Sequence, residues 1–105
     1  MMFLVSSRYE GSILAGMSEE RLLDIRKGIQ EGFEAGAIQA SYTITGGGSF
    51  WVIEAETEAI VSRMLRTLGV KNAEVTPVVR TLDLIDAYIE QRRDPVTPVP
   101  RTDFP

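Results

Sequence analysis

Three consecutive glycines, Gly46 to Gly48, and the serine after them separate two stretches that have the patterns of β-strands. Residues 38–45 alternate between apolar and polar side chains, whereas residues 50–55 are almost wholly apolar. A short glycine connection between two strand patterns is typical of a β-hairpin. A phosphate-binding loop would need a helix directly after the glycines and a lysine at a fixed offset, and this stretch has neither. The glycines are therefore predicted to form a turn.

The rest of the chain contains patterns for two more strands and three helices. Ser18 and Thr57 are placed to cap helices, and Gly36 and Gly69 are placed to end them. Pro77 cannot donate a hydrogen bond to a neighbouring strand, so its strand should lie at an edge or be irregular. The predicted elements are a strand at 2–9, a helix at 18–35, a helix at 57–68, a strand at 73–80 and a helix at 82–92.

The order of the elements predicts the fold class. Strand, helix, strand, strand, helix and strand, followed by a further helix, give an α+β protein with the ferredoxin-like βαββαβ arrangement and a four-stranded antiparallel sheet. In this arrangement two helices cover one face of the sheet. Phe50 and Val52 are apolar on one side of their strand, as Trp51 and Ile53 are on the other. An apolar face that no helix covers indicates a partner surface or a ligand pocket.

Length and composition bound the domain organisation. The 105 residues suit one domain, which is expected at 1–93, and residues 94–105 hold four of the five prolines and are expected to form an extended tail. The apolar runs are too short for a membrane span, and the N-terminus lacks the basic residues of a secretory signal. We expect a cytoplasmic protein that does not bind membranes. The net charge of −4, with dispersed basic residues, makes nucleic acid an unsuitable partner.

The absence of two residue types excludes much chemistry. The chain has no cysteine and no histidine, which excludes disulfides, thiolate nucleophiles, structural zinc and histidine acid/base catalysis. A hard cation held by carboxylates would remain possible, but the chain has no D-x-D-x-D-G loop. We expect neither a metal ion nor another cofactor.

The segment FWVIEAETEAIVSRMLRTLGVKNAEVTPVV, from Phe50 to Val79, resembles a family of small bacterial proteins of unassigned function. The shared features are a strand that begins with aromatic residues and ends in an acidic residue, a short helix, and a strand close to EVTPV. The layout over nearly ninety residues is similar to the dimeric α+β-barrel superfamily, which includes muconolactone isomerase and antibiotic-biosynthesis-type monooxygenases. The resemblance implies a homodimer with sheets face to face and a cavity between sheet and helices. Mechanisms that rely on histidine cannot be carried over to this chain.

Several polar side chains are candidates for a site. Glu54 ends an apolar strand face and is the candidate general acid or base; the alternative is an edge residue paired with Arg8 or Arg80. Tyr42, on the inward face of its strand, is a candidate for orienting a carbonyl, or is a core residue. Arg8 and Arg80, expected at the ends of central strands, are candidates for binding a carboxylate, or form surface ion pairs. Phe50 is a candidate ligand contact.

Two functional hypotheses follow. The first is a small dimeric domain that binds a small, mainly apolar molecule, with cofactor-free isomerase or monooxygenase chemistry; it expects Glu54, Tyr42 and an arginine around one pocket. The second is a non-catalytic assembly protein, dimeric or larger, that uses its sheet face together with its last helix or tail. It expects a filled interior. Trp51 is expected to pack under the helices or, alternatively, to stack on a ligand, and the last helix covers its own sheet or the dimer mate.

Overall fold

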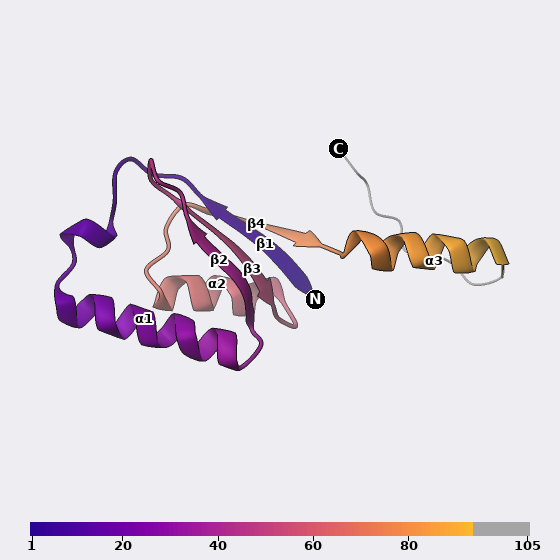
Figure 1. Ribbon diagram of the computed structural model, residues 1–105, viewed down its shortest axis with the longest axis horizontal. Helices are drawn as coiled ribbons and strands as arrows, with labels where there is room; N and C mark the ends of the chain where they lie inside the picture. The colour runs from indigo at the N-terminus through magenta and orange to yellow at the C-terminus, as the bar shows by residue number, and fades with distance from the viewer. Residues whose placement is uncertain (94–105) are drawn as a thin grey trace.

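The computed structural model describes residues 1–93 of the chain (Figure 1). The predicted tail at 94–105 lies outside the described residues. Strands and helices follow in the predicted order, and a short 3-10 turn precedes the first helix. The elements are β1 (Met2–Ser7), η1 (Leu14–Gly16), α1 (Glu19–Glu34), β2 (Ile38–Thr43), β3 (Ser49–Glu54), α2 (Glu58–Thr67), β4 (Ala73–Val78) and α3 (Thr81–Arg93).

The four strands form one antiparallel sheet in the order β2-β3-β1-β4. Both α1 and α2 lie on the same side of this sheet (Figure 1). This is the ferredoxin-like α+β arrangement that the sequence predicts. The two central strands are β1 and β3, and β4 is an edge strand that accommodates Pro77, as its missing N–H requires.

The predicted caps and the glycine turn are confirmed. Ser18 Oγ accepts a hydrogen bond from the Arg21 amide, and Thr57 Oγ1 accepts one from the Ile60 amide. In the hairpin, Gly47 and Gly48 both have a φ angle of 119°, which L side chains rarely adopt. A Cβ atom on either glycine would also meet the backbone of the Ser7–Gly11 segment. Glycine is therefore required here both by the turn and by the close approach of the β1 end.

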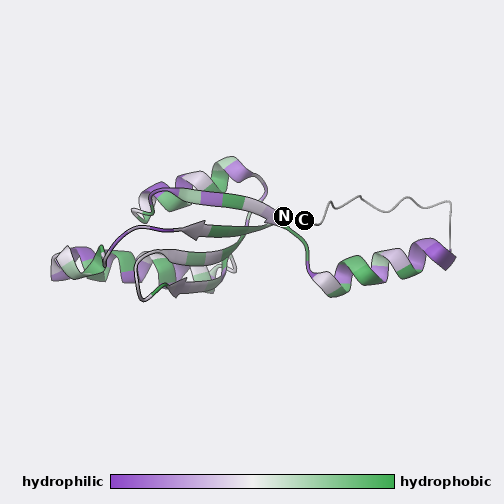
Figure 2. Cartoon of the chain, turned by 90° about the horizontal axis from the view of Figure 1, so that it is seen from above, coloured by the Kyte–Doolittle hydropathy of each residue, from purple (hydrophilic) through white to green (hydrophobic). Residues whose placement is uncertain are grey.

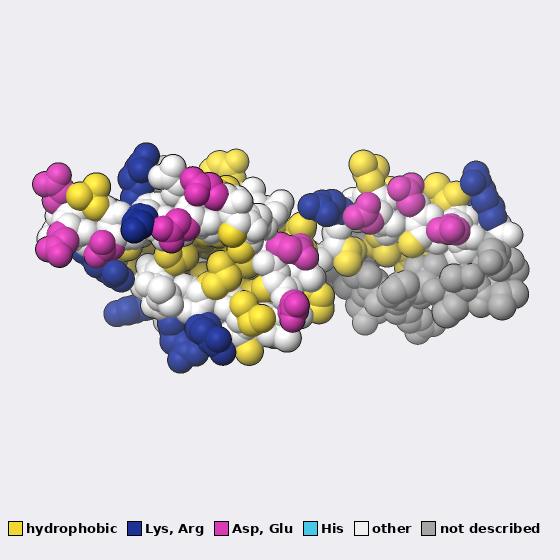
Figure 3. All heavy atoms as spheres, turned by 90° about the horizontal axis from the view of Figure 1, so that it is seen from below, with side chains coloured by type: hydrophobic (Ala, Val, Ile, Leu, Met, Phe, Trp, Pro, Cys, Tyr) yellow, Lys and Arg dark blue, Asp and Glu magenta, His cyan; other side chains and the backbone are white. Residues whose placement is uncertain are grey.

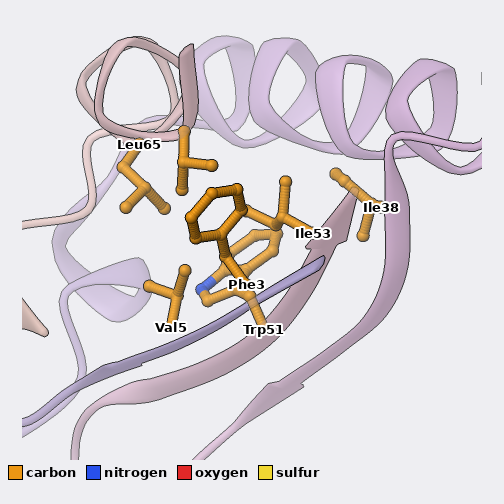
Figure 4. Close-up of a cluster of buried hydrophobic side chains, with 7 residues drawn as sticks. Phe3, Val5, Ile38, Trp51, Ile53 and Leu65 are labelled. Carbon is orange, nitrogen blue, oxygen red and sulfur yellow. The ribbon is translucent and has the colours of Figure 1, made fainter. Parts of the chain in front are cut away.

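The core lies between the sheet and the two helices (Figure 4). It consists of buried side chains from three strands and α2, namely Phe3, Val5, Ile38, Trp51, Ile53, Val61 and Leu65. Trp51 is 4% exposed and lies among them, as expected for a residue under the helices. Its strand neighbours Phe50 and Val52 point to the other side of the sheet.

A bulge in β2 corrects one prediction. Ile38 pairs with Ile53 and Ala40 pairs with Val52, so the register shifts by one residue at Gln39. The Gln39 side-chain amide donates a hydrogen bond of 2.6 Å to the Gly36 carbonyl. The shift places Ile38 in the core and Tyr42 on the opposite face. The inward position predicted for Tyr42 from its alternation with Ile38 is wrong for this chain, and Tyr42 is 68% exposed.

No described helix covers the second face of the sheet. Instead, α3 continues beyond the end of β4 and lies past the sheet and not over it (Figures 1 and 2). The radius of gyration is 17.1 Å, compared with about 13 Å for a compact chain of similar length. Several apolar side chains of α3 are exposed, among them Leu82, Ile85, Tyr88 and Ile89. Of the helices described, none has the length and apolar character that crossing a membrane requires.

Candidate functional site: a pocket between the sheet and the first helix

A small cavity of about 80 Å³ lies on the helix side of the sheet, next to Trp51. Its floor is formed by the ends of β2 and β3, and its other walls come from α1, the turn after α2 and the segment that joins β1 to α1. We call this cavity the Trp51 pocket. The lining residues are Tyr9, Ile13, Leu14, Met17, Ile25, Ile29, Ser41, Thr43, Ser49, Trp51, Leu68, Gly69 and Val70.

Hydroxyl groups are gathered on the sheet side of the Trp51 pocket. Ser49 pairs across the strands with Ser7 and with Thr43, and Trp51 pairs with Ser41. Because residues opposite each other on neighbouring strands share a face, these side chains form two adjacent rows. Three strands thus contribute hydrogen-bonding groups to one end of the covered sheet face.

Ser49 is the centre of a buried hydrogen-bond network. The Trp51 indole Nε1–H donates to Ser49 Oγ over 2.9 Å, and the Ser7 and Ser49 hydroxyl oxygens are 3.2 Å apart. Ser7 is 1% exposed, and its hydroxyl pairs with that of Ser49, where either oxygen can be the donor. With Ser7 donating, the hydroxyl hydrogen of Ser49 remains available to a group in the pocket.

The opposite wall of the Trp51 pocket is apolar. Ile25 and Ile29 come from α1, and Ile13, Leu14 and Met17 come from the segment at residues 10–17. No residue of η1 is buried. The hydrogen bonds found in this segment join its own residues, such as the Met17 amide to the Leu14 carbonyl at 3.1 Å. The segment therefore covers the pocket, and these hydrogen bonds do not connect it to the sheet or to α1.

The lining of the Trp51 pocket contains one titratable side chain, Tyr9. Carboxylates, ammonium groups and guanidinium groups are missing from this lining. Within residues 1–93, no three carboxylates lie close enough together to hold a metal ion. The pocket thus offers hydrogen bonds and apolar contacts to a neutral molecule.

Tyr42 and Phe50, two predicted ligand contacts, are cross-strand neighbours on the uncovered face of the sheet. Phe50 is 37% exposed. The next rows of this face hold Ala40, Val52 and Leu4, and then Met2. The structure therefore brings the two aromatic residues together, but on the side of the sheet that faces away from the Trp51 pocket.

Glu54, the predicted acid or base, lies at the opposite end of the same uncovered face. Its carboxylate accepts a hydrogen bond of 3.0 Å from the amino group of Met1, and the two side chains are 47% and 63% exposed. This partner replaces the arginine that the sequence suggested. The Met1 carbonyl also accepts a bond of 2.9 Å from the Ala55 amide. The ion pair thus fastens the start of β1 to the end of β3.

Arg8 and Arg80 lie at opposite ends of the sheet. Ser7 pairs with Ala73 and Met2 pairs with Val78, so the residue after β1 and the residues after β4 are far apart. Arg8 borders a separate shallow cavity of about 390 Å³ beside the glycine turn. Arg80 follows an edge strand, which corrects its predicted position at the end of a central strand. Within a single chain, the predicted site residues do not gather around one pocket.

The sequence contained a signal for the Trp51 pocket that the prediction did not use. Ser49 has the same parity as Trp51, and Ser41 and Thr43 have the parity opposite to Tyr42. The row of hydroxyls on the helix side was not predicted, because the regular alternation of residues 38–45 assigned Ser41 and Thr43 to a polar, solvent-facing side. The bulge at Gln39 is what reverses that assignment.

No family model matches the sequence, and no significant match occurs among the curated proteins. One similar solved structure is that of 5-chloro-2-hydroxyhydroquinone dehydrochlorinase (TftG) from Burkholderia phenoliruptrix AC1100, in complex with 2,5-dihydroxybenzoquinone. The match has a TM-score of 0.54 and 16% sequence identity, and it covers 79% of this chain and 98% of that chain. A similarity at this level of identity concerns the fold. It agrees with the ferredoxin-like α+β arrangement read from the strand order.

Proposed function

We propose that this protein binds a small, mainly apolar ring compound with hydrogen-bonding oxygen atoms, and that the Trp51 pocket is the site. The observation that carries the proposal is the composition of the two walls. Serine and threonine hydroxyls lie on the sheet side, where the Trp51 indole N–H donates to Ser49, and aliphatic side chains lie on the helix side. A planar neutral molecule with oxygens at one edge matches both walls. TftG, which has a similar fold, was solved with a planar ring compound that carries oxygen atoms, 2,5-dihydroxybenzoquinone.

The pocket must open to admit a ring. Its volume of about 80 Å³ is close to half that of a cavity known to hold benzene, about 150 Å³. Ile13 and Leu14 of the covering segment are 37% and 40% exposed, so moving this segment outward breaks few buried contacts. Residues 10–17 therefore act as a lid in this proposal.

The chemistry available in the pocket is hydrogen bonding to a ring oxygen. The hydroxyl hydrogen of Ser49, which is free when Ser7 donates to it, and the hydroxyls of Ser41 and Thr43 suit a carbonyl or a phenolate oxygen. They would stabilise an oxyanion that develops there. Acid/base chemistry by Glu54, which the sequence suggested, would need a second binding place on the uncovered face. The binding role does not depend on it.

The test is a titration of the purified protein with 2,5-dihydroxybenzoquinone. Trp51 is the only tryptophan and lines the pocket, so quenching of its fluorescence, corrected for absorbance, reports occupancy. Ser49→Ala should weaken binding by up to about tenfold through the loss of a hydrogen bond. Ser6→Ala, one residue from Ser7 but on the other face, is the matched control and should change nothing. Absence of quenching and of calorimetric heat at millimolar ligand would overturn the proposal.

The proposal includes a homodimer in which the uncovered sheet faces pack together. Leu4 and Val52 lie at the centre of this face, with Met2, Ala40 and Phe50 around them. A second copy supplies an apolar surface of the same shape, and a twofold axis makes the contact self-complementary. This arrangement matches what the sequence resemblance implies. Native mass spectrometry at micromolar concentration gives the stoichiometry directly.

A second candidate function is assembly without ligand binding, and the exposed stripe on α3 favours it. Leu82 is 73% exposed, and Ile85 and Ile89 follow at helical spacing with exposures of 46% and 43%. The double variant Ile85→Gln/Ile89→Gln separates the two functions. In an assembly protein it shifts the concentration dependence of oligomerisation, measured by sedimentation velocity. In a ligand-binding protein it leaves the quinone affinity unchanged.

A further inference from the structure

A larger apolar groove lies along α1 next to the Trp51 pocket and shares lining residues with it. The groove has a volume of about 510 Å³ and is lined by Leu14, Leu22, Ile25, Arg26, Ile29, Gln30, Phe33 and Glu34. Three of these residues, Leu14, Ile25 and Ile29, also line the Trp51 pocket. We call the larger space the α1 groove. Leu14, which lines both cavities, belongs to the lid segment.

The apolar stripe of α1 extends beyond the core that it covers. Leu22, Ile25, Ile29 and Phe33 recur at spacings of three and four and lie on one face of the helix. Ile25 is buried, but Leu22 and Phe33 are 37% and 44% exposed. Figure 3 shows the molecule from the side of the two helices, where hydrophobic side chains are exposed among charged ones. Exposed apolar surface next to a pocket indicates a binding surface.

The lining of the α1 groove contains few polar groups, and this restricts the kind of ligand that the groove can bind. Arg26 donates a hydrogen bond of 3.1 Å to the side-chain carbonyl of Gln30, and Arg26 and Glu34 are the two charged residues of the lining. The stretch from Leu22 to Phe33 is about 16 Å long along the helix axis. An open apolar surface of this length, beside a row of polar side chains on the same helix, suits an extended hydrocarbon chain.

We propose that the ligand is a ring compound that carries an alkyl tail, such as an alkyl-substituted quinone or hydroquinone. The ring lies in the Trp51 pocket, where it accepts hydrogen bonds from the hydroxyl wall. The tail passes Leu14 and lies along Leu22 and Phe33 in the α1 groove. Displacement of Leu14 admits the ring and joins the two spaces in one step. This inference rests on the proposed function, since it assigns the ligand class of the same site.

The experiment compares two probes on the intact protein. The first is 2,5-dihydroxybenzoquinone, and the second is the same ring with a decyl substituent. Binding is followed by Trp51 fluorescence and by calorimetry, below the concentration at which the tailed probe forms micelles. The tailed probe should bind at least about tenfold more tightly, because the tail removes apolar surface from water.

Substitutions in the groove show where the tail lies. Phe33→Asp should cancel most of the gain of the tailed probe and leave the affinity of the tail-free probe unchanged. Leu22→Asn is a second variant with the same expectation, and both positions are exposed enough for the fold to tolerate them. Leu23→Asp is the control, because Leu23 is 59% exposed and lies outside the groove lining.

The possible failures are distinguishable. Equal affinity of both probes, or a gain that survives Phe33→Asp and Leu22→Asn, overturns the tail inference and leaves the ring pocket in place. Absence of binding by either probe overturns the proposed function as well. A change of oligomeric state in Phe33→Asp, with no change in tailed-probe affinity, identifies the groove as a contact with a second copy and also overturns the inference.

Discussion

The Trp51 indole nitrogen donates a hydrogen bond of 2.9 Å to Ser49 Oγ, and both residues are buried. Ser49→Ala removes this acceptor and leaves a buried N–H without a partner. We expect the free energy of unfolding to fall by about 1–3 kcal/mol. Ser7→Ala is the matched variant, because it removes a hydroxyl from the same network but keeps the acceptor of Trp51. It should cost less, about 0.5–1.5 kcal/mol.

Urea unfolding followed by far-ultraviolet circular dichroism measures the free energy of unfolding of both variants. This free energy falls linearly with urea concentration, so it can be extrapolated to water. The emission maximum of Trp51 in the folded state supplies an independent readout, since the loss of the acceptor changes the surroundings of the indole only in Ser49→Ala. Equal losses of stability in the two variants would show that the indole hydrogen bond contributes no more to stability than the hydrogen bond between the two serines.

The fold could be predicted from the sequence because its signals are local. Ser18 and Thr57 mark helix starts, Gly36 and Gly69 take positive φ angles at helix ends, and the glycine run can form only a turn between two strands. Each depends on the conformational preference of a few neighbouring residues. The order of the elements along the chain then indicates the ferredoxin-like topology.

The site could not be predicted in the same way, since it depends on register. One inserted residue at Gln39 moves Tyr42 to the other face and brings Ser41 and Thr43 to the helix side of the sheet. The partner of Glu54 could not be predicted either, because the amino group of Met1 is not part of any side-chain pattern. Cross-strand pairing and termini are set by tertiary contacts, and periodicity alone does not report them.

Two glycines of α1 should respond in opposite ways to the same substitution. A Cβ at Gly28 would lie 3.4 Å from the end of the Leu68 side chain, whereas a Cβ at Gly32 would lie 2.5 Å from Ile38 Cδ1 and 2.8 Å from its Cγ1. Gly28→Ala should raise the free energy of unfolding by up to about 1 kcal/mol through helix propensity. Gly32→Ala should lower it by about 1–3 kcal/mol, because Ile38 is buried and cannot move aside.

Thermal unfolding of the two single variants tests whether one is stabilised and the other destabilised. A double variant tests whether contact with Ile38 causes the destabilisation. Ile38→Ala removes the atoms that the new methyl group would meet, so adding Gly32→Ala to it should no longer be destabilising. A Gly32→Ala penalty that persists in the Ile38→Ala background would mean that the strain arises elsewhere along the helix.

Glu54→Gln should have a small effect on stability and none on binding in the Trp51 pocket. The ion pair with the Met1 amino group is largely exposed, and exposed pairs contribute about 0–1 kcal/mol before screening by salt. The carboxylate also lies on the face of the sheet that points away from the pocket. Quinone titrations of the wild type and of Glu54→Gln, repeated across pH, measure this. A pH-dependent loss of affinity or turnover in the variant would restore Glu54 as a functional acid or base.

Val52→Glu should dissociate the proposed dimer. Val52 lies on the uncovered face between Leu4 of β1 and Ala40 of β2, so a carboxylate there would be buried twice, once in each protomer, at a twofold interface. Loss of a central interface contact costs about 2 kcal/mol or more, which corresponds to at least about thirtyfold weaker association. Light scattering after size-exclusion chromatography at several concentrations gives the shift.

Leu23→Glu, an exposed apolar position on α1, is the control and should remain dimeric. A Val52→Glu variant that keeps the wild-type mass at the lowest concentration would place the subunit contact elsewhere and leave the exposed stripe of α3 as the surface to examine.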